Sequence, residues 1–294
     1  MKRALKAKTI IVMITAVFAI SSLLAACGGA PADTGADNGG AGKLAGTVTV
    51  SGSTSVQPLA QDLSDVFKEV EPGISVEVQG GGSTQGVKDA SEGTSDIGSC
   101  SRDLTKEEKA LGITEHVIAY DGIAVVVHAG NSIGNLSKDQ IVKIFKGEIK
   151  NWKEVGGPDS EILVVTREES SGTRTAFEEL LKLQEKKDDK TFSLIRADAL
   201  VADGNGAVKA NVASKENAIG YTSLGFVDDT LKKVNIDSIE CTVDTVKSKT
   251  YPVSRPFILL TKGDLKPEVK AFLDFILSAK GQEVVGKSYV KAVE

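Results

Sequence analysis

The chain has 294 residues, of which 41% are hydrophobic and 26% are charged, a composition typical of a folded globular protein. Its 35 Lys and Arg residues are outnumbered by 40 Asp and Glu residues, which gives a net charge of −5. Nucleic acids are bound through an excess of positive charge, so this balance argues against a nucleic-acid partner.

The first 26 residues are predicted to be a lipoprotein signal peptide. Four basic residues among the first eight precede an apolar run at 10–20, which is too short to span a bilayer. The sequence Leu24-Ala25-Ala26-Cys27 then matches a lipobox, although an ordinary secretory signal is the alternative. Lipid (palmitate) on Cys27 would anchor the chain to the extracytoplasmic face of the cell membrane.

Residues 27–44 are predicted to be the lipidated cysteine and a flexible tether. The stretch is rich in glycine and has almost no apolar side chain beyond alanine, so it cannot bury enough surface to fold. Removal of the signal peptide would leave 31 basic against 40 acidic residues, a net charge of about −9. A protein with this overall field binds an anion through local dipoles.

Beyond the tether, segments with strand and helix patterns alternate along the chain. Strands are predicted at 47–50, 74–78, 96–101, 123–128, 162–165, 218–221 and 251–261. Helices are predicted at 59–67, 86–90, 138–145, 177–183 and 268–285, with another beginning at Thr105. The strand at 251–261 is expected to pair with the strand at 123–128.

This alternation predicts an α/β fold with two lobes, each a mostly parallel sheet flanked by helices. Two crossover segments near Gly122 and Tyr251 would join the lobes. The first lobe is expected to comprise 45–122 together with 251–294, and the second 123–250. A ligand would lie in the cleft between them, beyond the carboxyl ends of the strands.

Three strand-to-helix junctions share a turn rich in Ser, Thr and Gly, at 51–55, 80–84 and 170–174. The first amides of a helix lack internal partners and carry partial positive charge, so such a junction can hold an anion. A Ser or Thr at each position can also serve only as a helix cap. Three junctions of this kind in one chain predict a single oxyanion held by converging helix starts.

The cysteines and histidines predict no metal or cofactor. Cys100 and Cys241 lie far apart in the sequence, and two free buried thiols are favoured over one disulfide. His116 and His128 do not show the spacing of metal ligands.

Seven segments together resemble the phosphate-binding lipoproteins of bacterial phosphate import systems, which belong to the bilobed (type II) periplasmic-binding-protein class. The segments are 51–58, 81–86, 97–102, 120–124, 144–152, 167–174 and 218–221. The resemblance implies a monomeric solute-binding protein without enzymatic activity. Such a protein captures inorganic phosphate between two lobes and delivers it to an ABC permease.

The resemblance also implies which residues hold the ligand: Ser53, Thr54, Ser55, Ser83, Ser101, Asp121, Arg167, Ser171, Gly172 and Thr173. Arg167 would grip two phosphate oxygens in a forked contact. The alternative for Arg167 is an ion pair with Glu168 or Glu169. Gly172 would allow the backbone to approach the anion closely.

One position departs from the family pattern. Some members carry an aspartate at the position of Ser101. That carboxylate accepts a hydrogen bond from the proton that phosphate retains near neutral pH, and it repels fully ionised sulfate. Asp121 is the best substitute acceptor in this chain and Asp103 the second. The alternative role for Asp121 is to shape the Asp-Gly turn.

Two other functions remain open from the sequence. One is a binding protein for another tetrahedral oxyanion, such as sulfate, molybdate or tungstate. The other is an extracytoplasmic phosphatase, against which stand the lack of a Gly-x-Ser-x-Gly motif and of a histidine near the Ser and Thr turns.

Overall fold

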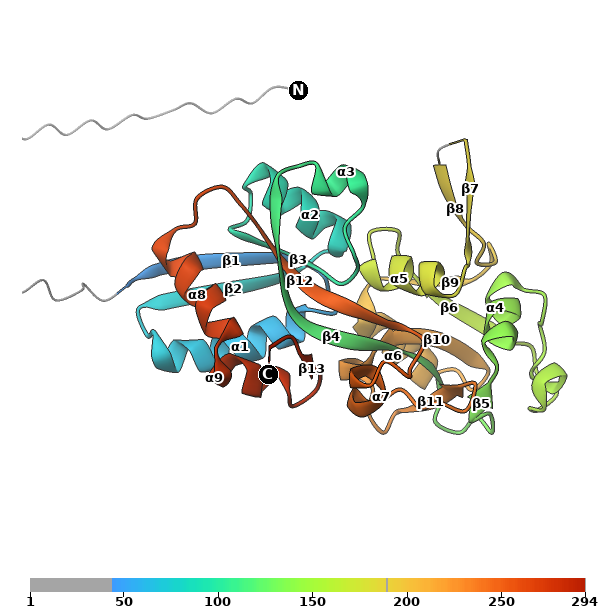
Figure 1. Cartoon of the computed structure of the whole chain (residues 1–294). Helices are drawn as coiled ribbons and strands as arrows, with labels where there is room; N and C mark the ends of the chain where they lie inside the picture. Colours follow the sequence, from blue (N-terminus) through green and yellow to red (C-terminus); the bar gives the residue numbers. More distant parts are fainter. Residues whose placement is uncertain (1–43, 189, 294) are drawn as a thin grey trace, which may run out of the picture. The chain divides into compact units, whose positions relative to one another are not determined.

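The computed structural model describes residues 44–188 and 190–293 (Figure 1). The predicted signal peptide, Cys27 and the predicted tether up to residue 43 therefore lie outside the described residues. The described strands are β1 Gly46–Gly52, β2 Ile74–Gly80, β3 Ile97–Cys100, β4 Ile113–His128, β5 Asn135–Leu136, β6 Leu163–Arg167, β7 Gln184–Lys187, β8 Lys190–Ser193, β9 Leu200–Ala202, β10 Ala218–Ser223, β11 Leu231–Ile236, β12 Ser254–Lys262 and β13 Val290–Lys291. The described helices are α1 Gln57–Val70, α2 Ser83–Glu92, α3 Lys106–Lys109, α4 Lys138–Lys146, α5 Gly172–Leu180, α6 Gly204–Ala213, α7 Val243–Lys247, α8 Pro267–Leu277 and α9 Ala279–Val285, with 3-10 turns at Trp152–Val155 and Leu224–Phe226.

The first lobe is built on the parallel strands β2, β1 and β3, in that order across the sheet. Alternate residues of β1, Val48 and Val50, are buried against the apolar face of α1. Phe67 of α1 packs against Phe272, with ring centroids 5.1 Å apart, so the carboxyl-terminal helices share this core. These parallel strands end at one edge of the sheet, where the loops that follow β1 and β3 meet.

The second lobe has its own parallel set, β10, β6 and β9. Its core contains Phe145, Trp152 and Phe177, which are fully buried. The ring of Tyr221 stacks on Phe177 with centroids 4.0 Å apart. This packing holds the end of β6 against β10, next to the third Ser-Gly-Thr turn.

Two long strands, β4 and β12, join the lobes and run antiparallel side by side (Figure 1). The expected pairing of 251–261 with 123–128 is wrong, because β12 pairs with the first half of β4, Gly122 opposite Ser254. The second half of β4 lies between β10 and β11 and pairs antiparallel with both. Consecutive residues 123–127 of β4 are all fully buried, so the strand is covered on both faces of the sheet, which accounts for its continuous apolar run.

The predicted helix at 268–285 is two helices in the structure. Backbone at Ser278 is extended, and its hydroxyl accepts a hydrogen bond from the Gly281 amide, so Ser278 ends α8 and caps α9. Helix α6 and the β7–β8 hairpin are elements that the sequence patterns did not predict.

The described part of the chain carries no helix that is long and apolar enough to cross a membrane. Within the same residues, no group of three or more His, Cys, Asp or Glu side chains could hold a metal ion. Cys100 and Cys241 are both buried and unpaired. Burial raises the pKa of the Cys241 thiol to about 12.

Candidate functional site

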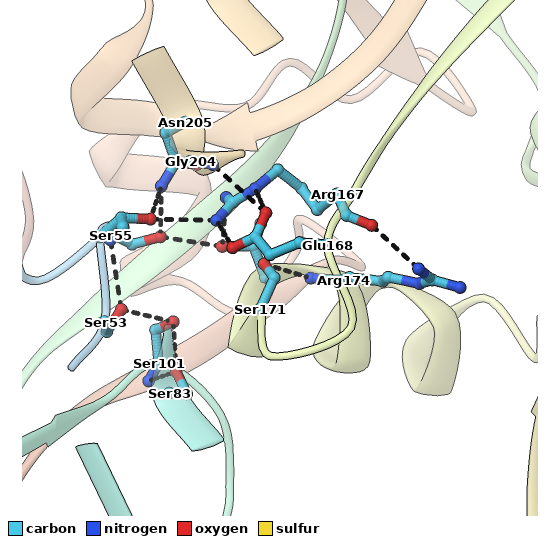
Figure 2. A network of polar contacts seen from close by, with 12 residues as sticks. Ser53, Ser55, Ser83, Ser101, Arg167, Glu168, Ser171, Arg174, Gly204 and Asn205 are labelled. Atoms are coloured by element: carbon cyan, nitrogen blue, oxygen red, sulfur yellow. Dashed lines mark hydrogen bonds and ion pairs between the residues drawn. The ribbon is translucent and has the colours of Figure 1, made fainter. Parts of the chain in front are cut away.

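Hydroxyl groups from three loops of the first lobe meet at the carboxyl ends of β1 and β3 (Figure 2). Ser53, Thr54 and Ser55 connect β1 to α1, Ser83 is the first residue of α2, and Ser101 directly follows β3. Ser53 Oγ donates to Ser101 Oγ at 2.9 Å, and the Oγ atoms of Ser83 and Ser101 are 3.3 Å apart. The Ser53, Ser55, Ser83 and Ser101 side chains are buried, so these hydroxyls form one cluster.

Gly52 allows the chain to turn sharply into this cluster. Its φ of +126° lies where L side chains are strained, and a β-carbon there would lie 2.4 Å from the carbonyl oxygen of Ser99. The carbonyl of Gly52 then accepts hydrogen bonds from the amides of Gly81 and Gly82. The β1–α1 and β2–α2 turns are thereby held together.

The second lobe contributes the end of β6 and the start of α5. Tyr221 Oη lies 2.8 Å from Thr166 Oγ1 and accepts a hydrogen bond from the amide of Arg167, so the buried tyrosine positions the end of the strand. Ser171 caps α5 by accepting from the Arg174 amide at 3.2 Å. Arg174 in turn donates to the carbonyl oxygen of Arg167 at 2.9 Å.

Arg167 lies at the centre of the polar contacts and its side chain is only 1% exposed. It donates through Nε and Nη2 to the two oxygens of Glu168 at 2.8 and 2.6 Å. The same guanidinium donates through Nη2 to Thr54 Oγ1 of the first lobe at 3.0 Å. Arg167 therefore makes the ion pair with Glu168 and a contact with the predicted site residue Thr54 at the same time.

The Glu168 carboxylate is ionised in this arrangement. Burial alone would raise its pKa, but hydrogen bonds and charge from Arg167, with a hydrogen bond from the Gly204 amide, outweigh burial and lower the pKa. Glu168 thus neutralises part of the Arg167 charge and fixes the plane of the guanidinium.

Several contacts join the two lobes at this site. Ser55 Oγ and Thr173 Oγ1 are 2.8 Å apart, and the Thr84 amide donates to the carbonyl oxygen of Ser170 at 3.2 Å. A β-carbon on Gly172 would lie 2.1 Å from Ser83 Oγ and 2.9 Å from Ser101 Oγ. Only a glycine at 172 allows the start of α5 to come this close to the first-lobe hydroxyls.

Asn205 is a site residue that the sequence reasoning missed. It lies in the first turn of α6 and is fully buried. Its Nδ2 donates to Ser55 Oγ at 2.8 Å and to Thr54 Oγ1 at 3.2 Å. The signal was present as Asp203-Gly204-Asn205-Gly206, a fourth turn between a strand and a helix.

Arg255 was also missed, because it lies inside a strand pattern with no turn beside it. It is in β12 and is 3% exposed. Its Nη2 donates to Ser55 Oγ at 3.0 Å, and its Nη1 donates to the carbonyl oxygen and Oγ of Ser101 at 3.0 and 3.2 Å. The site therefore has a second buried guanidinium on the first-lobe side.

Asp121 reaches the cluster only through Arg255. Its Oδ2 accepts from Arg255 Nη2 at 2.9 Å and Nε at 3.2 Å, and its Oδ1 accepts from the Ser223 hydroxyl and the Leu224 amide. Burial raises the pKa of Asp121, and Arg255 opposes that shift. Arg255 itself stays charged, because an arginine does not lose its proton in a protein.

The second predicted acceptor, Asp103, is exposed, and its carbonyl oxygen accepts a hydrogen bond from Arg102. Arg102 forms a forked ion pair with Glu108.

Taken together, the cluster can bind a compact oxyanion. It offers hydroxyl donors from both lobes, two guanidinium groups and the starts of α1, α2, α5 and α6. The two histidines are engaged elsewhere, His116 with Thr261 and His128 with the Gly130 amide. The hydroxyls therefore have no neighbouring imidazole to act as a general base.

Comparison with known proteins gives consistent matches. A family model described as a PBP superfamily domain matches residues 37–280. The phosphate-binding protein PstS of Bacillus subtilis (strain 168) is 32% identical over 98% of this chain and 95% of that protein. The phosphate-binding protein PstS of Borreliella burgdorferi is 31% identical over 81% of this chain and 87% of that protein.

Solved structures show the same likeness. A putative phosphate ABC transporter substrate-binding protein with bound phosphate, from Clostridium perfringens, is 43% identical, with a TM-score of 0.80 over 85% of this chain and 100% of that chain. An ABC-type phosphate transport receptor from Vibrio cholerae is 36% identical, with a TM-score of 0.70 over 84% of this chain and 100% of that chain.

Proposed function

Because this chain belongs to the PBP superfamily and, within it, to the PstS family of phosphate-binding proteins, we propose that it captures inorganic phosphate between its two lobes and delivers it to an ABC permease. The observation that carries the proposal is the meeting of hydroxyls from both lobes around Arg167, which contacts Thr54 of the first lobe and Thr173 of its own lobe. The phosphate-bound relative from Clostridium perfringens supports the choice of ligand.

In this proposal the ligand site is formed by the residues predicted from the sequence: Ser53, Thr54, Ser55, Ser83, Ser101, Arg167, Ser171, Gly172 and Thr173. Asn205 and Arg255 join them, and Asp121 acts by holding Arg255. Hydrogen bonds that involve a charged group contribute roughly 1.5–3 kcal/mol each, so Arg167 is expected to contribute the largest single share.

The mechanism is lobe closure. Phosphate oxygens would bridge the hydroxyls of the first lobe, 45–122 with 251–294, and Arg167 with the α5 start of the second lobe, 123–250. A ligand favours the state in which it contacts both half-sites, so binding shifts the population toward the closed form that the permease engages. The two crossover strands β4 and β12 provide the connection about which the lobes move.

Proteins of this family are extracytoplasmic transport receptors. We place this chain on the outer face of the cell membrane, held by lipid on Cys27 through the glycine-rich tether and acting as a monomer without cofactor. We assign it no enzymatic activity, since the site hydroxyls lack a neighbouring imidazole base.

The test is a calorimetric titration of the purified, ligand-stripped protein with phosphate, with sulfate and molybdate as competitors. One-site phosphate binding that excess sulfate and molybdate do not displace supports the proposal. A protein that binds molybdate or sulfate more tightly than phosphate would be a receptor for that anion instead, and hydrolysis of a phosphate monoester would make it a phosphatase.

A further inference from the structure

Three hydroxyls of the first lobe, those of the half-buried Thr54 and of the buried Ser55 and Ser101, share one property. Each accepts two hydrogen bonds from donors that the fold holds in place. A hydroxyl has two acceptor lone pairs and one proton, so a hydroxyl with both lone pairs engaged can only donate.

The donors come from three elements, β6, α6 and β12, and from Ser53 in the loop between β1 and α1. Thr54 Oγ1 accepts from Arg167 Nη2 at 3.0 Å and from Asn205 Nδ2 at 3.2 Å. Ser55 Oγ accepts from Arg255 Nη2 at 3.0 Å and from Asn205 Nδ2 at 2.8 Å, which leaves its proton to be donated toward Thr173 Oγ1, 2.8 Å away. Ser101 Oγ accepts from Arg255 Nη1 at 3.2 Å and from Ser53 Oγ at 2.9 Å.

Most of these bonds come from guanidinium or amide N–H groups, which can only donate. The Ser53 hydroxyl must donate to Ser101 because its oxygen accepts from the amides of Ser55 and Val56. The Asn205 amide is oriented by the Ser223 backbone N–H, which can only donate and does so to Asn205 Oδ1 at 3.2 Å. Thr222 Oγ1 donates to the same oxygen at 3.1 Å. The Nδ2 group therefore faces Thr54 and Ser55, and both of its protons are used by them.

Arg255 is held in the same way. All of its contacts are donated: to Asp121 through Nε and Nη2, to Ser101 through Nη1 and to Ser55 through Nη2. Asp121 thus places a guanidinium behind two site hydroxyls. Arg255 is a positioning residue, which acts on the ligand through Ser55 and Ser101.

We propose that Asn205 and the Asp121–Arg255 pair polarise Thr54, Ser55 and Ser101 into obligate donors, so that the site takes doubly charged phosphate in preference to singly charged phosphate. An oxygen that still carries a proton must donate that proton, and toward these three hydroxyls it would meet only other donors. Doubly charged phosphate has three oxygens free of protons, one more than the singly charged form. The inference rests on the proposed phosphate function and specifies which ionic form is bound.

The charged groups that face the hydroxyls are Arg255 on β12, Asp121 on β4, and Arg167 and Glu168 at the end of β6. On β10, burial raises the pKa of Tyr221. Asp203, the residue before α6, is exposed. Glu168, which pairs with Arg167, is the alternative group to accept a hydrogen bond from the phosphate proton. Its carboxylate already accepts hydrogen bonds from Arg167 and from the Gly204 amide.

The test compares phosphate affinity at pH 6 and pH 8, because phosphate passes from one to two negative charges between them. Affinity is expected to rise about tenfold from pH 6 to pH 8 if only the doubly charged form binds well. Fluorophosphate is doubly charged and carries no proton over this range, so its affinity is expected to stay constant. An equal rise for fluorophosphate would assign the pH effect to a protein group such as Asp121 and overturn the inference.

The Asn205→Asp variant inverts the polarity without changing the shape of the side chain. Thr54 and Ser55 would then donate to the new carboxylate and present lone pairs to the ligand. Phosphate affinity at pH 8 is expected to fall at least tenfold, and the ratio of affinities at pH 8 and pH 6 to shrink to about twofold or less. Asn211→Asp makes the same change farther along α6, where the side chain bonds to Ala207, and is expected to keep the wild-type ratio.

Two results contradict the inference while leaving the phosphate function intact. One is wild-type phosphate affinity that is equal at pH 6 and pH 8. The other adds to this a pH dependence that appears in the Glu168→Gln variant, which would mean that Glu168 accepts the hydrogen bond from the phosphate proton in the wild type. Absence of phosphate binding at both pH values would instead refute the proposed function itself. The wild-type comparison decides the matter even if Asn205→Asp fails to fold.

Discussion

Gly172 and Ser83 come from different lobes, and a β-carbon on Gly172 would lie only 2.1 Å from Ser83 Oγ. Gly172→Ala is therefore expected to hinder the approach of α5 to the first-lobe hydroxyls. An overpacked contact costs about 1–3 kcal/mol, so phosphate affinity should fall roughly tenfold or more. Calorimetry with phosphate measures the effect.

Gly206→Ala is the matched control for that substitution, since Gly206 has no atom within 4 Å of the position of its β-carbon. It should bind phosphate as the wild type does. Wild-type affinity in Gly172→Ala would show that the lobes do not come together at this glycine when the ligand is bound.

Arg167→Ala should weaken phosphate binding by about tenfold or more, because it removes a charged donor that spans both lobes. Arg196→Ala is a suitable control, since the Arg196 guanidinium forms its ion pair with the exposed Asp198 and not with a residue of the site. Affinity within twofold of the wild type in Arg167→Ala would refute the assigned role.

Asp121→Asn should destabilise the fold, because it leaves the buried Arg255 guanidinium without its counter-charge. Breaking a buried ion pair on one side costs about 3–5 kcal/mol, which urea unfolding can measure. Asp198→Asn removes an exposed partner of Arg196 and should leave stability near that of the wild type. If Asp121→Asn keeps its stability and raises sulfate affinity relative to phosphate, Asp121 is the ligand acceptor suggested by the sequence.

Ionised Glu168 is expected to stabilise the folded protein near neutral pH and to lose this effect in acid. Its pKa in the folded protein is lowered below the ordinary value of 4.5, so its contribution is present above that value and is lost as the pH falls through the folded-state pKa. The melting temperature of the wild type should exceed that of Glu168→Gln near neutral pH. The difference should shrink below about pH 4.

Glu169→Gln is the control for this measurement, because the neighbouring Glu169 is exposed. Its melting temperature should follow the wild type at every pH. A gap between wild type and Glu168→Gln that persists unchanged at low pH would mean that the Arg167–Glu168 ion pair is not its source.

Much of the site could be predicted because it is encoded locally. A strand, a Ser-Gly-Thr turn and a helix start are contiguous in sequence, and parallel strands bring such turns to one edge of a sheet. The structure brings together the groups that this argument predicts to be close, namely Ser53, Ser83, Ser101 and the start of α5. Whether these groups bind the ligand stays a prediction.

Arg255 and Asn205 could not be found in this way, because their contacts span 200 and 150 residues of sequence. Inside β12, Arg255 resembles any charged residue of a strand, and only the pairing of β12 with β4 places it beside Asp121. The partner of the strand at 123–128 was predicted wrongly for the same reason, because its apolar run indicates burial but not which distant strands pair with it. The break at Ser278 depends on a single hydroxyl cap inside a helical pattern.

The most direct test of the account is a crystal structure of the protein with phosphate. We expect one phosphate between the lobes, within hydrogen-bond distance of Arg167 and of the hydroxyls of Thr54, Ser55 and Ser101. Phosphate held by one lobe alone, or at a position away from Arg167, would contradict the account.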